Sequence, residues 1–193
     1  MIKIEKKPFT ELQSERLVLK PHEVSFAYAT MVYTIIKENW VYLTRFLDKL
    51  LDVKAAEDEF AFFESSNKAW QEMNKAEYGM WTKQGELIGT CGVFNVDYDA
   101  ASCEIGYWLK PSQTGKGYMT EAVKTLEDEF FARGFNRIII VMDTENTSCE
   151  KLAIRRGYTK EGIMRQWHYN PTFKSYRDMC LYAKLKSEWE KQR

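Results

Sequence analysis

The spacing of hydrophobic and polar positions changes along the chain and predicts strands and amphipathic helices. Short apolar runs bounded by turn residues predict strands, whereas apolar residues three and four positions apart predict helices. The predicted strands are 16–20, 77–83, 87–94, 102–109, 137–142, 158–165 and 176–185. The predicted helices are 24–39, a short one within 40–51, 54–75, one that follows the glycines at 115 and 117 and ends at Gly134, and one from Thr147 to Gly157.

The order of these segments predicts the fold class. Early strands are joined by tight turns such as Gln84–Glu86, whereas later strands alternate with helices, which is typical of a mixed α/β sheet. The continuous apolar run at 137–142 predicts a strand buried on both faces. We expect a single domain over 1–193, with its core at about 14–186 and a charged tail at 187–193.

Composition and charge exclude several classes of function. The 193 residues include 28 Lys+Arg and 28 Asp+Glu, so the formal net charge is zero and gives no indication of nucleic-acid binding. No apolar run is long enough to span a bilayer, and residues 1–7 lack the apolar segment of a signal peptide. The four cysteines and two histidines are scattered, which argues against disulfides and a metal site. We expect a cytoplasmic monomer or homodimer that binds neither nucleic acid nor membrane.

The segment Thr114–Ala122 is a glycine-rich turn that opens into a predicted helix directly after a predicted strand. The unpaired N–H groups at a helix start and the positive end of the helix dipole attract phosphates, and Lys116 adds a full charge. The P-loop pattern is absent, and Thr120 stands where a dinucleotide fingerprint needs its third glycine. Two interpretations stay open: a phosphate site, or a tight turn with close helix packing.

Several segments, taken in their order and spacing, resemble one family. They are Glu15–Pro21, Glu104–Leu109, Thr114–Ala122, Asn146–Ala153, Arg156–Tyr158 and Asp178–Trp189. Together they resemble the GNAT superfamily of N-acetyltransferases, and within it the RimL/RimJ-like branch that acetylates N-terminal amines of ribosomal proteins. The resemblance covers nearly the whole chain. It implies a largely antiparallel sheet of about six to seven strands, splayed at the acetyl-CoA site and flanked by about four helices.

The resemblance also implies the co-substrate, acetyl-CoA, and the residues that hold it. The family's pyrophosphate loop, [QR]-x-x-G-x-[GA], aligns with Thr114–Met119, which departs from it at its first and sixth positions. The pantetheine arm is expected to pair with the end of the strand before this loop. The implied cofactor residues are Trp108, Leu109, Lys110, Thr114, Gly115, Lys116, Gly117, Tyr118, Met119, Thr120 and Asn146.

Acetyl transfer to an amine requires a base, a donor to the thioester oxygen and a proton for the leaving thiolate. Glu104 is the candidate base, directly or through water; the alternative is a structural carboxylate. A backbone N–H near Leu109 is the family-like donor to the oxygen. Cys149, with Ser148 beside it, occupies the position where the family often has a serine acid. The alternative for Cys149 is a small buried hydrophobic residue.

The acceptor is the least constrained part of the prediction. The candidate substrate-binding residues are Trp40, Tyr42, Trp167 and Tyr169, with Arg45 and His168 nearby; the alternative for the aromatics is core or rim packing. The leading acceptor is a protein N-terminal α-amine, and the second is a small amine such as a polyamine or an aminoglycoside. A non-catalytic acyl-CoA-binding module of the same fold is the alternative of another class.

Overall fold

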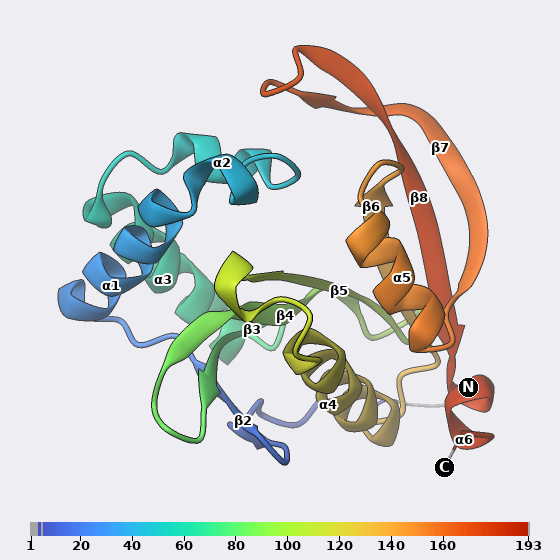
Figure 1. Cartoon of the computed structure of the whole chain (residues 1–193). Helices are drawn as coiled ribbons and strands as arrows, with labels where there is room; N and C mark the ends of the chain where they lie inside the picture. Colours follow the sequence, from blue (N-terminus) through green and yellow to red (C-terminus); the bar gives the residue numbers. More distant parts are fainter. Residues whose placement is uncertain (1–3, 5, 193) are drawn as a thin grey trace.

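The computed structural model describes residue 4 and residues 6–192 (Figure 1). Residues 1–3, 5 and 193, which belong to the predicted N-terminal segment and charged tail, lie outside the described residues. The strands are β1 (Leu12–Gln13), β2 (Leu17–Pro21), β3 (Ala76–Thr82), β4 (Leu87–Asp97), β5 (Ser102–Leu109), β6 (Arg137–Asp143), β7 (Thr159–Asn170) and β8 (Ser175–Leu185). The α-helices are α1 (Phe26–Glu38), α2 (Trp40–Leu43), α3 (Ala56–Gln71), α4 (Tyr118–Ala132), α5 (Thr147–Arg155) and α6 (Lys186–Glu190), with short 3-10 helices η1 (Asp48–Asp52) and η2 (Pro111–Gln113).

The described strands form one eight-stranded sheet in the order β1-β2-β3-β4-β5-β6-β8-β7. Neighbouring strands are antiparallel except for β5 and β6, which are parallel. The predicted mixed, largely antiparallel sheet is therefore confirmed. The eighth strand is the two-residue β1 at the edge, and the helices beyond the expected four are α2 and α6, with four and five residues.

Two hydrophobic clusters hold the helices on opposite faces of the sheet (Figure 1). The larger cluster joins the sheet to α4 and α5. The smaller joins it to α1 and α3. The predicted apolar face of α4 is confirmed, because these residues are all buried: Met119, Ala122, Val123, Leu126 and Phe130. The burial therefore fixes the axis of α4, and with it the position of the glycine turn that precedes the helix.

Two predictions about burial were wrong. In β6, Ile138 and Ile140 are buried, but Ile139 and Val141 are partly exposed, because α1 and α3 cover the β2–β4 end of the sheet instead (Figure 1). The tail is not merely charged, because it folds into α6 and buries Trp189, which is 6% exposed.

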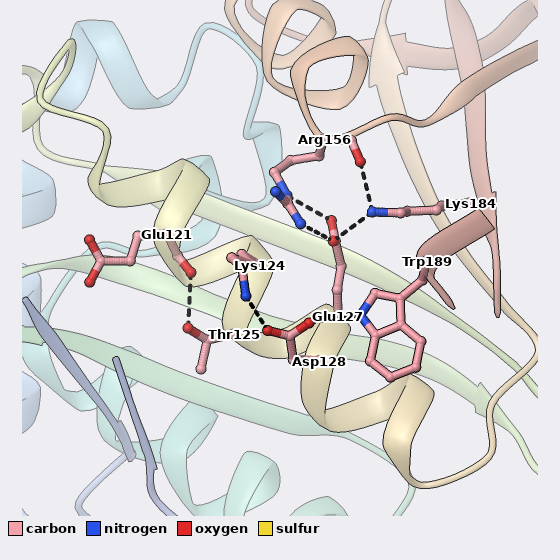
Figure 2. A network of polar contacts seen from close by, with 8 residues as sticks. All are labelled: Glu121, Lys124, Thr125, Glu127, Asp128, Arg156, Lys184 and Trp189. Atoms are coloured by element: carbon pink, nitrogen blue, oxygen red, sulfur yellow. Dashed lines mark hydrogen bonds and ion pairs between the residues drawn. The ribbon is translucent and has the colours of Figure 1, made fainter. Parts of the chain in front are cut away.

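A buried ionic network fastens the middle of α4 to the rest of the domain (Figure 2). Glu127 lies on the buried face of α4 and is 0% exposed. Its carboxylate accepts hydrogen bonds from both Arg156, at 2.5 and 3.3 Å, and the fully buried Lys184, at 3.0 Å. Beside it, the Trp189 indole N–H donates to Asp128 at 2.7 Å. A carboxylate desolvated to this degree needs such partners, so the network constrains how α4, β8 and α6 are placed.

The last two strands form a hairpin that is longer than predicted. β7 continues to Asn170 instead of ending near residue 165, and its pairing with β8 shifts register between Met164 and His168. The hairpin curves away from the sheet and its tip reaches back toward α2 (Figure 1). This arch frames the region where a site was predicted.

Candidate active site

The central strands β5 and β6 separate partway along their length. They pair only where Ser102–Glu104 lies beside Arg137–Ile139. Beyond this point β5 runs on to Leu109 and β6 to Asp143, and in the described part of the chain no strand fills the gap between them. Free strand edges present N–H and C=O groups that can pair with an extended ligand. The predicted splay is therefore present.

A glycine on β4 allows the end of β5 to lie beside the splay. Gly89 pairs with Leu109, and a Cβ at position 89 would lie 2.2 Å from the carbonyl oxygen of Trp108. Any other residue would force the two backbones apart. Lys110 leaves the strand, and its ammonium pairs with Glu86 at 3.2 Å. The predicted residues Trp108 and Leu109 thus line one side of the splay, while the Lys110 side chain is engaged elsewhere.

The glycine turn connects the end of β5, through η2, to the first turn of α4. Gly115 and Gly117 have φ of +75° and +83°, a left-handed conformation that favours glycine. Residues 114–117 are exposed, and Gly117 is the N-cap of α4 without a side-chain capping bond. The first N–H groups of α4 are therefore available to an anion, and left-handed residues in such a turn orient successive N–H groups toward one side.

The side chains of the turn explain its departures from the family pattern. The Thr114 hydroxyl donates to the carbonyl of Pro111 at 2.8 Å, so it stabilises the turn itself. The Met119 side chain is 8% exposed and belongs to the core, so its size does not fill the loop. The Lys116 ammonium donates to Gln113 at 2.8 Å. Thr120 accepts from Arg155 at 3.3 Å.

A groove of about 750 Å³ runs from Gly117 along α4. One wall is residues 12–16, and the other is the end of α5 with Arg155 and Arg156. Lys124 also lines it. The groove is therefore continuous with the glycine turn. It carries four cationic side chains together with four carboxylates, which are Glu15, Glu121, Asp128 and Glu129.

The start of α5 lies across the splay from β5. Asn146 is the N-cap of α5, and its side-chain oxygen accepts from the N–H of Cys149 at 3.2 Å. Thr147 is the first residue of the helix, and Glu150 accepts a hydrogen bond from the Tyr182 hydroxyl at 2.6 Å. Asn146 therefore has a structural role in addition to the predicted contact with the cofactor.

The buried Cys149 and the partly buried Tyr107 form a pair beside the splay. The Cys149 sulfur lies 3.0 Å from the Tyr107 hydroxyl oxygen. Burial raises the pKa of the Cys149 thiol to about 11, although the hydrogen bond with Tyr107 acts in the opposite direction. Burial, with Cys149 nearby, also raises the pKa of Tyr107 well above its usual value. Both groups hold their protons at neutral pH, which suits a hydrogen-bond donor rather than a nucleophile. Ser148, next along the helix, is exposed.

Glu104 lies where β5 and β6 part, on the opposite face of β5 from Tyr107 because strand side chains alternate. Its carboxylate accepts a hydrogen bond from the Asn95 side-chain amide at 2.9 Å. Asn95 has φ of +48° at an irregularity in the β4–β5 pairing. A left-handed non-glycine residue is uncommon and here turns a polar side chain toward the candidate base.

The tip of the β7–β8 hairpin contacts the segment after α2. The buried Asn170 donates to the carbonyl of Arg45 at 3.3 Å, and Thr172 donates to the carbonyl of Thr44 at 3.1 Å. His168 lies with its Nε2 3.1 Å from Asp48. These contacts close the arch over the splayed part of the sheet (Figure 1).

The structure does not bring the four predicted acceptor aromatics together. Trp40 and Tyr42 line a hollow of about 310 Å³ with Pro111, near the start of the glycine turn. Trp167 and Tyr169 alternate with His168 along β7, so they lie on the face opposite to Asp48. They are 67% and 48% exposed.

Two further observations bear on ligand classes. Among the described residues, His, Cys, Asp and Glu side chains nowhere gather in a group of three or more that could hold a metal ion. The helices in this part of the chain are too short or too polar to traverse a bilayer.

The splay, the glycine turn and the capped α5 match a known domain. A family model described as an acetyltransferase (GNAT) domain matches residues 16–159. The chain belongs to the GNAT acetyltransferase family. This GNAT enzyme is 31% identical over 180 residues to an uncharacterized N-acetyltransferase, p20, of Bacillus licheniformis, covering 92% of this chain and 97% of that one. It is 27% identical over 168 residues to the ribosomal-protein-serine acetyltransferase of Escherichia coli strain K12, covering 86% and 92%.

Solved structures share the fold of this GNAT acetyltransferase. RimL, the ribosomal L7/L12 α-N-protein acetyltransferase in complex with coenzyme A, superimposes with a TM-score of 0.86 at 23% identity, over 92% of this chain and 99% of that one. The microcin C7 self-immunity acetyltransferase MccE, in complex with acetyl-CoA and AMP, gives 0.82 at 23% identity, over 89% and 93%. At such identities the likeness establishes the fold.

Sequence reasoning missed three residues that the structure places at the candidate site. Tyr107 stands two positions before Leu109, on the face that packs against α5. Asn95 directly follows the predicted strand 87–94. Arg16 lies in a segment that resembles the family, and it contacts the glycine turn about a hundred positions later. Partners far apart in sequence leave no local signal, so only the fold reveals them.

Proposed function

We propose that this enzyme transfers the acetyl group of acetyl-CoA to the α-amine of a protein N-terminus. The choice of acetyl-CoA as the donor is supported by the splay between β5 and β6, which opens directly beside the exposed glycine turn. An extended pantetheine arm would pair with the edge of β5, its pyrophosphate would bind the N–H groups at Gly117 and Tyr118, and its nucleotide would continue into the groove.

The acceptor class is supported by the relatives. One relative is named a ribosomal-protein-serine acetyltransferase, and a structural neighbour acts on a ribosomal protein N-terminus. The small-molecule alternative keeps one supporting observation: a structural neighbour was solved with a small molecule, AMP, beside acetyl-CoA.

The reaction we propose is direct transfer. A base removes one proton of the incoming ammonium, and the free amine attacks the thioester carbon to form a tetrahedral intermediate. The C–S bond then breaks to release coenzyme A as a thiolate, and the second proton of the attacking nitrogen leaves to solvent or to that thiolate, which gives the neutral amide. Glu104, oriented by Asn95, is the proposed base. His168, oriented by Asp48, is the second candidate. The N–H near Leu109 would stabilise the charge on the thioester oxygen.

Cys149 is proposed to stabilise the leaving thiolate. Its raised pKa keeps the proton on Cys149 Sγ, since an ordinary thiol titrates about two units lower. A hydrogen bond from Cys149 to the thiolate is therefore favoured over complete proton transfer. Tyr107 holds the sulfur in place.

The test is a mass-spectrometric screen with acetyl-CoA. Peptides that vary in their first residues compete with spermidine and an aminoglycoside. We expect a mass increase of one acetyl group on peptide α-amines. Acetylation confined to the small amines would refute the N-terminal acceptor.

The same assay, run with variants, assigns the roles. Glu104→Gln is expected to lower kcat at least a hundredfold, in the range usual for a general base, and His168→Gln to lower it less. The reverse order would make His168 the base.

Cys149→Ala is expected to lower kcat by about tenfold, consistent with one hydrogen bond to a charged group, whereas Cys149→Ser retains most of the rate. Equal kcat values in the wild type, Cys149→Ala and Cys149→Ser would exclude Cys149 from the mechanism.

A further inference from the structure

Arg16, near the start of β2, makes a set of contacts that converge on the glycine turn. Its Nη1 donates to the carbonyl oxygen of Lys116 at 2.9 Å, and its Nε donates to Glu121 at 2.6 Å. The guanidinium also lies over the ring of Tyr118, with its carbon 4.7 Å from the ring centroid. One side chain therefore touches the turn, the first residue of α4 and the first turn of that helix.

Glu121 is held from several directions. The Arg16 main-chain N–H and the Ser14 hydroxyl each donate to Glu121 Oε1 at 2.7 Å. Burial alone would raise the pKa of Glu121, but the hydrogen bonds from Ser14 and from both parts of Arg16 lower it below its ordinary value. The carboxylate is therefore ionised at neutral pH, neutralises Arg16 locally and fixes the direction of its guanidinium.

The contact with Lys116 has a consequence for the next residue. The carbonyl of Lys116 and the N–H of Gly117 belong to one planar trans peptide group and point in opposite directions. Glycine turns are otherwise free to rotate this plane, because Gly115 and Gly117 carry no side chain that restricts it. A hydrogen bond that holds the oxygen on the Arg16 side therefore aims the Gly117 N–H toward the opposite side.

We propose that Arg16 is a positioning residue for the donor site: by holding the Lys116 carbonyl it pre-orients the Gly117 N–H toward the pyrophosphate of acetyl-CoA. This inference rests on the donor site proposed above. An arginine is required because its planar fork donates to the carbonyl and the carboxylate at once. A lysine ammonium carries its three N–H donors on a single nitrogen, so it does not span two acceptors that Arg16 reaches from Nε and Nη1.

The opposing explanation is that Arg16 binds the phosphate directly by its charge. The two explanations predict opposite changes in the affinity for coenzyme A when Glu121 is replaced by Gln. If Arg16 positions the turn, loss of the carboxylate loosens Arg16 and weakens binding of coenzyme A. If Arg16 acts as a cation, loss of the neighbouring negative charge strengthens binding.

The experiment is isothermal titration of coenzyme A into the wild type and four variants, which needs no acceptor. We expect Arg16→Gln and Arg16→Lys each to raise Kd about tenfold, the size of one hydrogen bond to a charged group, and Glu121→Gln to raise it about threefold. Arg133→Gln is the matched control. Arg133 likewise bonds a carboxylate, Glu129, and main-chain carbonyls, but at the other end of α4. Its Kd should stay within twofold of wild type.

Each outcome is decisive. An unchanged Kd in Arg16→Gln, a wild-type Kd in Arg16→Lys, or tighter binding in Glu121→Gln overturns the positioning role. A rise in Kd with Arg133→Gln equal to that with Arg16→Gln would reduce the effect to general stability. If Arg16→Gln fails to fold, Arg16→Lys and Glu121→Gln carry the test. Absence of binding in the wild type itself would refute the donor site rather than the role of Arg16.

Discussion

The two halves of the site are built by different means. On the donor side, charged groups cross-link α4 at two levels: Arg16 and Glu121 at its first turn, and the buried Glu127 with Lys184 at its middle. On the acceptor side, the hairpin tip meets the segment after α2 mainly through hydrogen bonds to main-chain carbonyls.

This difference has a physical meaning. A desolvated carboxylate with two cationic partners tolerates little displacement, because each partner lost leaves an unpaired buried charge. The neutral hydrogen bonds of Asn170 and Thr172 contribute about 1 kcal/mol each, and no charge is left unpaired when one of them breaks. The donor half is therefore the rigid part of the molecule, and the acceptor half is the part whose shape can vary with the substrate.

The largest effect is expected from breaking the buried network. Glu127→Gln leaves Lys184 buried without its counter-ion and should lower the free energy of unfolding by about 3–5 kcal/mol, measured by urea denaturation. Arg137→Gln, which removes a surface pair with Glu161, is the control and should cost less than about 1 kcal/mol.

The double variant Glu127→Leu/Lys184→Met sharpens this prediction. Replacing both buried charges by apolar groups should recover much of the lost stability. If Glu127→Gln lowers the free energy of unfolding no more than Arg137→Gln does, this network does not hold the donor half in place. The difference proposed between the two halves would then be wrong.

Much of the fold could be predicted because its signals are local. The bounds of β5 agree with prediction residue for residue, and the apolar face of α4 follows directly from helical spacing. The glycine turn was found because glycine is the residue that a left-handed turn favours. The GNAT family could be recognised for the same reason, since its motifs are short and ordered along the chain.

What sequence reasoning missed depends on contacts between distant segments. Helical spacing places Glu127 on the buried face of α4, one turn after Val123, but its charge argues against burial. Its partners Arg156 and Lys184, which make the burial possible, follow 29 and 57 positions later. The length of β7 and the separation of Trp167 from Trp40 depend on how the hairpin bends. Tyr107 gains its role only when α5 places Cys149 beside it.

A smaller effect is expected on the acid stability of α1 and α3, the helices on the acceptor side of the sheet. Burial, aided by Lys75, lowers the pKa of His22 to about 3, and its ring stacks on Phe63 and hydrogen-bonds Tyr28. The unfolded chain takes up this proton near pH 6.5, so stability is full above that pH and falls as the pH drops toward 3, by about 1 kcal/mol per unit.

Denaturant curves between pH 4 and pH 8 test this slope. His22→Gln should reduce the slope below pH 6 by about 1 kcal/mol per unit, and between pH 7 and 8 the two proteins should differ by a constant amount. An unchanged slope below pH 6 would show that His22 is not the group whose protonation destabilises these helices.

The smallest effect is expected where the hairpin meets η1, and it is the sharpest test of the comparison. Asp48→Asn removes the charge beside His168 but keeps the shape of the side chain. A partly exposed pair of this kind contributes at most about 1 kcal/mol, so the KM for the acceptor should change by no more than about fivefold. The Kd for coenzyme A should stay at its wild-type value, because the donor half is held by contacts that do not include this pair. Arg16→Gln should give the opposite pattern, with weaker coenzyme A binding and an unchanged KM for the acceptor. A single variant that moved both constants together would mean that the arch and the glycine turn are mechanically coupled, and the two halves would then have to be described as one unit.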